Sequence, residues 1–327
     1  MVMKKTAIAP TNIAFIKYWG RKDEILRLPT NGSISMNLSG LSTITTVEFD
    51  QKYQKDEVII HSIQSEKESS RVIKHLDRIR DLAHVFHRAK VVSHNNFPTA
   101  TGLSSSASGF AALTVAGCAA IGLKLNEKEL SILARQGSGS ACRSIPDGFV
   151  EWIDGDTSDT SYAESIFPLD YWDIVDVVTI VSDERKHIAT SEGQKRVDTS
   201  PFMSTRLNLI PEKIIQCKKY IKEKDFKLFG ELIESEALEL HAIMLTSQPS
   251  LIYWLPATIH VMKLVKKWRS EGLSVYFTVN TGQDIHLICQ KKEVPNLEEK
   301  LKTVQDIKKI IISYPSRGTA LTEQHLF

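Results

Sequence analysis

The chain has 327 residues, a formal net charge of +2 and 42% hydrophobic residues. This length exceeds that of most single hydrophobic cores, so we expect two lobes. The balanced charge gives no indication of a nucleic-acid partner. The four cysteines lie far apart without C-x-x-C spacing and the N-terminus lacks the apolar segment of a secretory signal, so we expect a cytoplasmic protein.

The first part of the chain reads as strands followed by one helix. Residues 5–18 form a short apolar segment that Pro10 interrupts, and residues 34–50 alternate apolar and polar side chains as a half-buried strand does. Residues 57–62 are a further strand candidate. Apolar residues recur at helical spacing over 68–88, which predicts an amphipathic helix before a short strand at 90–93.

Residues 98–107, PTATGLSSSA, form a loop of small and hydroxyl-bearing residues that leads into an alanine-rich helix. The first helical turn leaves N–H groups unpaired, and small residues let a phosphate approach them. No lysine follows the glycine, so this is not a Walker A loop. An ordinary N-capped loop is the alternative. The apolar stretch 110–123 is shorter than the ~20 residues that span a membrane.

A second loop of small residues follows the next predicted helix. Asn126 and Glu129 have the spacing of a capping box, and the helix that they open is expected to end near Gly137. Residues 137–144, GSGSACRS, can form a backbone nest for an anion. Arg143 within it can bind phosphate or carboxylate in bidentate fashion, or form a structural salt bridge.

The remaining pattern interleaves strands and helices without a strict βαβ rhythm, which favours an α+β fold. Strands are expected at 149–153, 175–182, 274–279, 285–290 and 310–313, and helices at 211–223, 225–245, 256–271 and 297–304. The polar segment 183–200 separates the two groups. We therefore expect an N-terminal lobe at 1–185 and a C-terminal lobe at 186–327.

Two further segments carry chemistry. Residues 17–22, KYWGRK, place three cations beside two aromatic rings, which suits a polyanion or a solvated strand end. Residues 279–283, VNTGQ, end a strand in a turn that either presents a polar side chain or is a simple hairpin. His241 lies between Leu240 and Ala242 and reads as a core histidine. No zinc-type spacing and no G-x-S-x-G elbow occur. Two anion nests and a cation cluster indicate a nucleotide and a small phosphorylated substrate.

Four segments carry a family resemblance: 13–21 (IAFIKYWGR), 29–35 (PTNGSIS), 95–107 (NNFPTATGLSSSA) and 135–152 (RQGSGSACRSIPDGFVEW). They resemble diphosphomevalonate decarboxylases of the GHMP kinase superfamily. The resemblance implies an N-terminal lobe like domain 2 of ribosomal protein S5, a ferredoxin-like C-terminal lobe and a homodimer. It also implies a reaction with ATP and Mg²⁺, in which the 3-hydroxyl of 5-diphosphomevalonate is phosphorylated. Carbon dioxide and phosphate then leave, giving isopentenyl diphosphate.

The resemblance also implies site residues by position. The catalytic positions are Lys17, Ser105, Arg143 and Asn280. Those for ATP are Ser93, Asn95, Asn96, Pro98, Gly102, Leu103, Ser104, Ser105, Ser106, Ala107 and Lys186, with Ser106 toward Mg²⁺. Those for the substrate are Tyr18, Trp19, Arg21, Lys22, Ser138, Gly139, Ser140, Arg143, Thr190 and Ser191.

One departure from the family pattern bears on the reaction. The family reads Thr-x-Asp-Ala-Gly-Pro-Asn, with the aspartate as its expected general base, where this chain reads TVNTGQD over 278–284. Asn280 occupies the aspartate's position, and an amide does not accept the hydroxyl proton. Asp284 is a nearby substitute, and Arg21 replaces the usual lysine. Three alternatives therefore stand: a kinase that stops before decarboxylation, a catalytically silent protein that binds nucleotide or isoprenoid precursor, and, from the S5-like lobe alone, an RNA-binding module.

Overall fold

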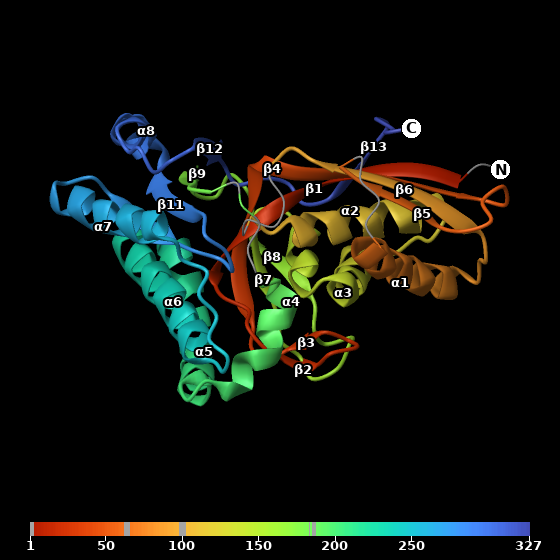
Figure 1. The fold of residues 1–327 in the computed structure, drawn as a ribbon, viewed down its shortest axis with the longest axis horizontal. Helices are drawn as coiled ribbons and strands as arrows, with labels where there is room; N and C mark the ends of the chain where they lie inside the picture. Colours follow the sequence, from red (N-terminus) through yellow and green to blue (C-terminus); the bar gives the residue numbers. More distant parts are fainter. Residues whose placement is uncertain (1–2, 62–65, 98–102, 183, 185–187) are drawn as a thin grey trace.

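The computed structural model describes residues 3–61, 66–97, 103–182, 184 and 188–327 (Figure 1). Its larger sheet has seven strands, of which five follow the order β13-β1-β4-β6-β5. These are β1 (Met3–Ile16), β4 (Ser33–Asp50), β5 (Glu57–Ile60), β6 (Arg88–Asn95) and β13 (Ala320–Thr322). The strand β7 (Phe149–Trp152) pairs with β4 and with β8 (Ala163–Phe167). A separate hairpin joins β2 (Arg21–Asp23) to β3 (Leu28–Pro29).

Pro10 does not interrupt the first strand, so that expectation was wrong. β1 runs through Pro10, and its register against β4 shifts between Pro10 and Thr11. A proline cannot donate to the ladder and is tolerated at such an irregularity. The long strand β1 therefore continues without a break to Ile16, directly before Lys17.

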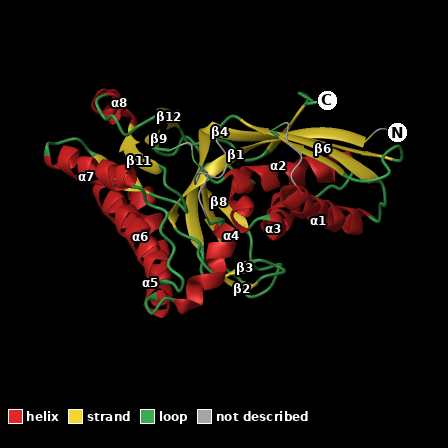
Figure 2. Cartoon of the chain, viewed as in Figure 1, coloured by secondary structure: helices red, strands yellow, loops and turns green. Residues whose placement is uncertain are grey.

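Three helices cover one face of this sheet: α1 (Glu66–Ala83), α2 (Ser105–Ala120) and α3 (Glu127–Gly137) (Figures 1 and 2). Helix α2 is apolar on nearly every side and is buried between the sheet and its neighbours. A Cβ on Gly117 would meet Ile79 Cδ1 at 2.8 Å, so the glycine permits this close approach. The predicted capping box is confirmed, since Asn126 and Glu129 bond to each other's backbone N–H.

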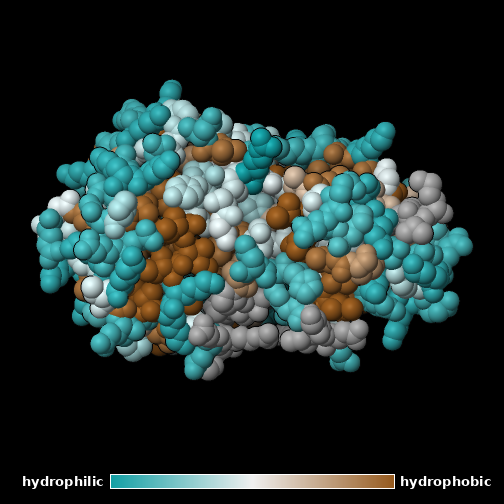
Figure 3. All heavy atoms as spheres, turned by 90° about the horizontal axis from the view of Figure 1, so that it is seen from above, coloured by the Kyte–Doolittle hydropathy of each residue, from teal (hydrophilic) through white to brown (hydrophobic). Residues whose placement is uncertain are grey.

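The second sheet has the order β10-β11-β9-β12 and is antiparallel. Its strands are β9 (Ile174–Ile180), β10 (Val275–Thr278), β11 (Ile285–Gln290) and β12 (Lys309–Ser313). Side chains of α7 (Pro256–Ser270) and α8 (Val294–Lys302) form one core with it. Those of α5 (Met203–Glu223) and α6 (Phe226–Thr246) form another, in which Phe229 and Ile233 join Phe15 and Ile34 of the first sheet. Hydrophobic atoms on the upper face gather in separate areas among hydrophilic ones (Figure 3).

The two-lobed α+β architecture is confirmed, but sheet membership does not follow the expected division at 185/186. β9 lies before that position and is an inner strand of the second sheet, whereas β13, near the C-terminus, pairs with β1. The helix expected to begin at Pro211 begins at Met203 and contains the proline. Among the helices that the structure describes, none is long and apolar enough to cross a membrane.

Candidate active site

The two loops of small residues meet at the start of α2. Ser106, in the first turn of α2, has its Oγ 3.2 Å from the Oγ of Ser138. Ser138 follows the last residue of α3 and caps the 3-10 helix η1 (Gly139–Ser144). Ser104, which caps α2, has a positive φ of 59°, a turn that an ordinary helix start does not need. The predicted nucleotide loop and the predicted substrate nest therefore face one place.

Arg143 is buried beside these loops without a carboxylate partner. Its Nη1 donates to Ser33 Oγ at 2.7 Å and its Nη2 to Asn12 Oδ1 at 3.1 Å. Its Nε is buried and has no hydrogen-bond partner among the described residues, and burial lowers the pKa of the guanidinium. No ion pair holds it among the residues that the structure describes, so the salt-bridge alternative is not supported. A desolvated guanidinium with neutral neighbours is suited to an anionic ligand.

The cation cluster of residues 17–22 separates into different environments. Tyr18 donates to Gln194 Oε1 at 2.8 Å and accepts from Arg21 Nε at 2.9 Å. Burial raises the pKa of the Tyr18 hydroxyl, which therefore stays protonated. Lys22 is exposed and pairs with Asp156 at 2.6 Å. Trp19 is fully buried in an apolar cluster, and its expected substrate-binding role stays a prediction.

Lys17 is 2% exposed at the end of β1. Its Nζ donates to Ala14 O at 2.6 Å and to Asn280 Oδ1 at 3.2 Å. Burial lowers the pKa of its amine to about 7, an effect that the charge of Glu236 opposes and that of Arg143 reinforces. The amine is thus poised between its charged and neutral forms at neutral pH.

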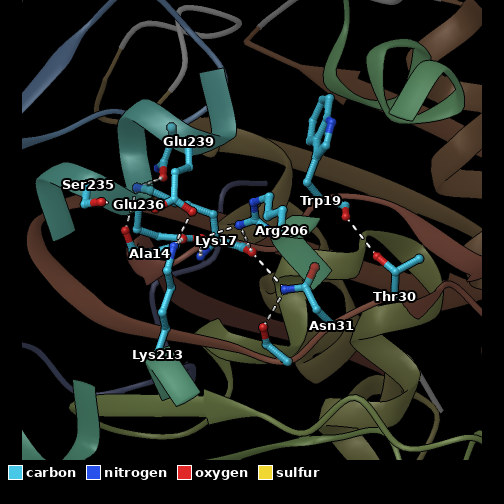
Figure 4. A network of polar contacts seen from close by, with 12 residues as sticks. Ala14, Lys17, Trp19, Thr30, Asn31, Arg206, Lys213, Ser235, Glu236 and Glu239 are labelled. Carbon is cyan, nitrogen blue, oxygen red and sulfur yellow. Dashed lines mark hydrogen bonds and ion pairs between the residues drawn. The ribbon is translucent and has the colours of Figure 1, made fainter. Parts of the chain in front are cut away.

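A buried ionic network fixes the backbone of Lys17 (Figure 4). Glu236 on α6 is fully buried, and its Oε1 accepts from Lys17 N at 3.1 Å. Arg206 on α5 pairs with the same carboxylate and donates to Lys17 O at 3.1 Å, while Lys213 Nζ lies 3.0 Å from Glu236 Oε2. Sequence analysis missed this network. The one signal was that Glu236 lies one helical turn from Ile233 and from Leu240, on the apolar side of its helix.

Asn280 follows β10 and bridges the two lobes. It accepts from Lys17, its Nδ2 donates to Ser104 Oγ at 3.3 Å, and its main-chain oxygen lies 3.0 Å from His241 Nε2. Burial lowers the pKa of His241 to about 3, so the neutral ring donates this bond through its Nε2–H. His241 also stacks on Trp254. It is a buried histidine, as expected, and it additionally fixes the position of Asn280.

The hydrogen bonds of Lys17 Nζ that the structure describes go to Ala14 and Asn280, and none of them goes to Asp284. It is 2% exposed, and its Oδ1 accepts from the backbone N–H of Val181, just beyond β9. The side chain that faces Lys17 from this turn is Asn280. The residue type at 280 therefore sets the charge beside the lysine.

Family models match both lobes. The model described as Diphosphomevalonate decarboxylase-like N-terminal domain matches residues 9–163. The model described as Mevalonate 5-diphosphate decarboxylase C-terminal domain matches residues 176–324.

The chain belongs to the diphosphomevalonate decarboxylase family.

A diphosphomevalonate decarboxylase from Aspergillus fumigatus is 38% identical over 93% of this chain and 81% of its own length. The crystal structure of mevalonate diphosphate decarboxylase from Staphylococcus aureus aligns with a TM-score of 0.93 at 38% identity, covering 99% of each chain. A structure of MDDEF in complex with MVAPP, AMPPCP and magnesium aligns with a TM-score of 0.93 at 38% identity. It covers 99% of this chain and 100% of its own. The family fold thus extends over both lobes.

The positions expected to bind ATP fall into two groups. Ser104, Ser105 and Ser106 open α2 and are at least partly accessible, whereas Leu103 and Ala107 are buried. The hydroxyl of Ser93 and the side-chain oxygens of Asn95 and Asn96 bond to Thr45, Thr43 and the Ser42 backbone, which shapes the strand end. Pro98, Gly102 and Lys186 lie outside the described residues.

The positions expected to bind the substrate mostly surround η1. Gly139 lies against Tyr18, whose ring a Cβ on the glycine would meet at 2.9 Å. Ser140 accepts from Asn12 through its main-chain oxygen, at 3.3 Å. Thr190 and Ser191 lie on the short helix α4 (Thr190–Gly193), where the Thr190 hydroxyl is 2.8 Å from that of Thr281, next to Asn280. These contacts bring α4 to the same site.

Two arginines without a motif also lie here. Arg27 donates through Nε to Gln136 O at 2.9 Å, and burial, reinforced by Arg21 and Arg71, lowers its pKa to about 10. Burial and the charge of Arg21 lower the pKa of Arg71. Mutual repulsion of this kind favours an anionic ligand. No group of three or more His, Cys, Asp or Glu in the described part of the chain could hold a metal ion.

Proposed function

We propose that this protein catalyses the ATP-dependent decarboxylation of 5-diphosphomevalonate. The observation that carries the proposal is the contact between Ser106 and Ser138, which brings two anion-binding loops to one place beside Arg143. A tertiary hydroxyl leaves badly as hydroxide, so decarboxylation needs it phosphorylated first. A nucleotide loop beside a substrate nest supplies that arrangement.

The residues divide between the two ligands. The start of α2, with the hydroxyls of Ser104, Ser105 and Ser106, suits the ATP phosphates, and Ser106 suits the Mg²⁺ that accompanies them. Mg²⁺ is usually held by nucleotide phosphates and few protein groups, so the site does not require a carboxylate cluster, and the described residues contain none that could hold a metal ion. When bound, the ion neutralises charge on the phosphates. Arg143 and Arg21, together with Ser138 to Ser140, suit the diphosphate and carboxylate of the substrate.

A kinase that releases the phosphorylated intermediate is the second candidate, and the neutral amide of Asn280 favours it. Phosphoryl transfer relies mainly on positioning, whereas departure of phosphate leaves positive charge that a nearby anion would stabilise. One assay separates the candidates: purified protein with ATP, Mg²⁺ and 5-diphosphomevalonate, with ADP and carbon dioxide measured separately. Equal yields of ADP and carbon dioxide support decarboxylation, and ADP alone supports the kinase. If neither product forms, the protein only binds its ligands.

We further propose a cytoplasmic homodimer. The four cysteines are free and buried, as in a reducing compartment. Leu238 and Leu245 on α6 and Ile259 on α7 are exposed and apolar, which a subunit contact would cover. Sedimentation over a range of concentrations tests this, and a mass of one chain throughout would contradict it.

A further inference from the structure

We propose that the neutral amine of Lys17 accepts the proton of the substrate's tertiary hydroxyl, in place of the carboxylate that the family resemblance expects at Asn280. This inference rests on the proposed function and names the base for its phosphorylation step. It starts from the position of Lys17 Nζ, which lies 3.2 Å from Asn280 Oδ1 and therefore next to the side chain that cannot accept a proton.

The hydrogen bonds of Lys17 match a neutral amine. A neutral amine has two N–H groups and one lone pair, whereas an ammonium has three N–H groups and none. Among the described residues, Nζ has two acceptors, Ala14 O and Asn280 Oδ1. Either form can donate to these two acceptors, and the neutral form then still has its lone pair to take a proton.

The surrounding charges do not hold the amine in its charged form. Glu236 on α6 and Asp176 on β9 favour the ammonium, and Arg143 on η1 and Arg206 on α5 oppose it. Both carboxylates are committed to other partners, Glu236 to Arg206 and Lys213 and Asp176 to His286. Burial is the largest influence and lowers the pKa of Lys17 to about 7, close to the value that suits a general base.

The phosphorylation step needs no reagent besides ATP, which is the co-substrate in the proposed function. The hydroxyl O–H bond breaks and the proton passes to Lys17 Nζ, directly or through one water. The oxygen forms a bond to the γ-phosphorus, and the bond from that phosphorus to the departing ADP oxygen breaks with its electron pair. Lys17 ends as an ammonium that donates a hydrogen bond to Asn280 Oδ1. An aspartate at 280 would instead hold Lys17 charged from the start and take the proton itself.

The test combines a titration with a rate. In protein carrying [ε-¹³C]lysine, the Lys17 resonance is assigned by its loss in Lys17→Arg and followed from pH 5 to 11. We expect a midpoint near pH 7, and a rise of at least one pH unit in Asn280→Asp. ADP formation from ATP, Mg²⁺ and 5-diphosphomevalonate is then measured from pH 6 to 9. It should rise through the same midpoint and fall ~100-fold or more in Lys17→Arg, which keeps the charge but has no lone pair to offer.

Lys218→Arg is the matched control, because Lys218 pairs with Glu151 away from the site and its replacement should leave the profile unchanged. Binding of 5-diphosphomevalonate to Lys17→Arg, followed by equilibrium dialysis, should stay within a few-fold of wild type. A Lys17 midpoint above pH 9, or ADP formation that Lys17→Arg preserves, overturns the base assignment alone. Absence of both ADP and carbon dioxide from the wild-type protein overturns the proposed function together with it.

Discussion

The hydroxyl oxygens of Ser106 and Ser138 lie 3.2 Å apart, although one serine belongs to α2 and the other to the junction of α3 and η1. The contact depends on the packing of α2 against α3 and η1, which share one hydrophobic core. The two loops that are expected to bind anions are thereby held at one place. The substrates of a phosphoryl transfer then need little further alignment.

Replacing Arg143 should affect binding more than stability. In Arg143→Ala we expect the KM for 5-diphosphomevalonate to rise about 10- to 100-fold, as the loss of a charged hydrogen bond implies. The Tm should fall less than in Arg135→Ala, because the loss of the hydrogen bonds to Ser33 and Asn12 is offset by removal of a buried charge that has no ion pair among the described residues. Steady-state kinetics and thermal unfolding measure the two effects. An unchanged KM would contradict the assignment.

Arg135 is the matched control for Arg143, since it is also buried but serves the fold. It donates to the carbonyls of Leu26 and Ser158, both at 3.0 Å. Arg135→Ala leaves these buried acceptors unpaired and should lower the Tm clearly. The two variants together separate ligand binding from scaffolding.

Changing Asn280 to aspartate should raise the rate of carbon dioxide release. The new carboxylate lies beside Lys17 and supplies the anion that stabilises positive charge as phosphate departs. Separate assays of the two products on the variant and the wild type test this. Asn208→Asp makes the same charge change on the exposed side of α5 and should alter neither product. A variant that releases carbon dioxide no faster than the wild type would show that another group already performs this role.

Glu236→Gln should destabilise the protein severely. Arg206 and Lys213 would lose a fully buried carboxylate, and breaking such a pair typically costs about 3–5 kcal/mol of unfolding free energy. Urea unfolding measures the loss. Glu239→Gln also removes a partner of Lys213, but its side chain is 35% exposed, so we expect a loss within about 1 kcal/mol. Similar losses for both variants would mean that burial does not set the cost.

His75 is buried in its neutral form, and this should make the protein less stable in acid. The His75 ring donates to or accepts from Thr114 Oγ1 at 2.8 Å, and burial lowers its pKa to about 3. The unfolded chain binds a proton near pH 6.5 and the folded chain does not, so stability is lost as pH falls below 6.5. Between pH 7 and pH 5, we expect the free energy of unfolding of His75→Gln to fall by about 2 kcal/mol less than that of the wild type. Urea unfolding at each pH measures this difference. Equal losses would refute this source of acid sensitivity.

Local sequence signals predicted local structure well. The Asn126 capping box, the alternation before Asp50 and the helical apolar spacing around Leu76 each depend on neighbours in the chain, and each is found close to its predicted place. The predictions at Pro10 and Pro211 were wrong because tertiary packing keeps a strand through Pro10 and a helix through Pro211. The strands β8 and β13 were missed because pairing partners far along the chain define them.

The candidate site shows the same division. Residues within motifs, such as Ser106 and Arg143, could be proposed because their types and spacing suit phosphate. Glu236 could not, because its role depends on where α6 lies relative to Lys17. The burial of Trp19 could not be predicted, because sequence proximity to cations does not show which way a side chain points.

The strand order of the second sheet has a practical consequence for anyone who dissects this enzyme. β9 lies between β11 and β12 but precedes residue 186 in the chain, and β13 returns to the first sheet from near the C-terminus. A fragment that starts at 186 would lack an interior strand, and one that stops at 185 would carry that strand with nothing to pair it. The two halves are therefore not separable modules, and swapping them between homologues requires junctions that keep β9 and β13 with their own sheets.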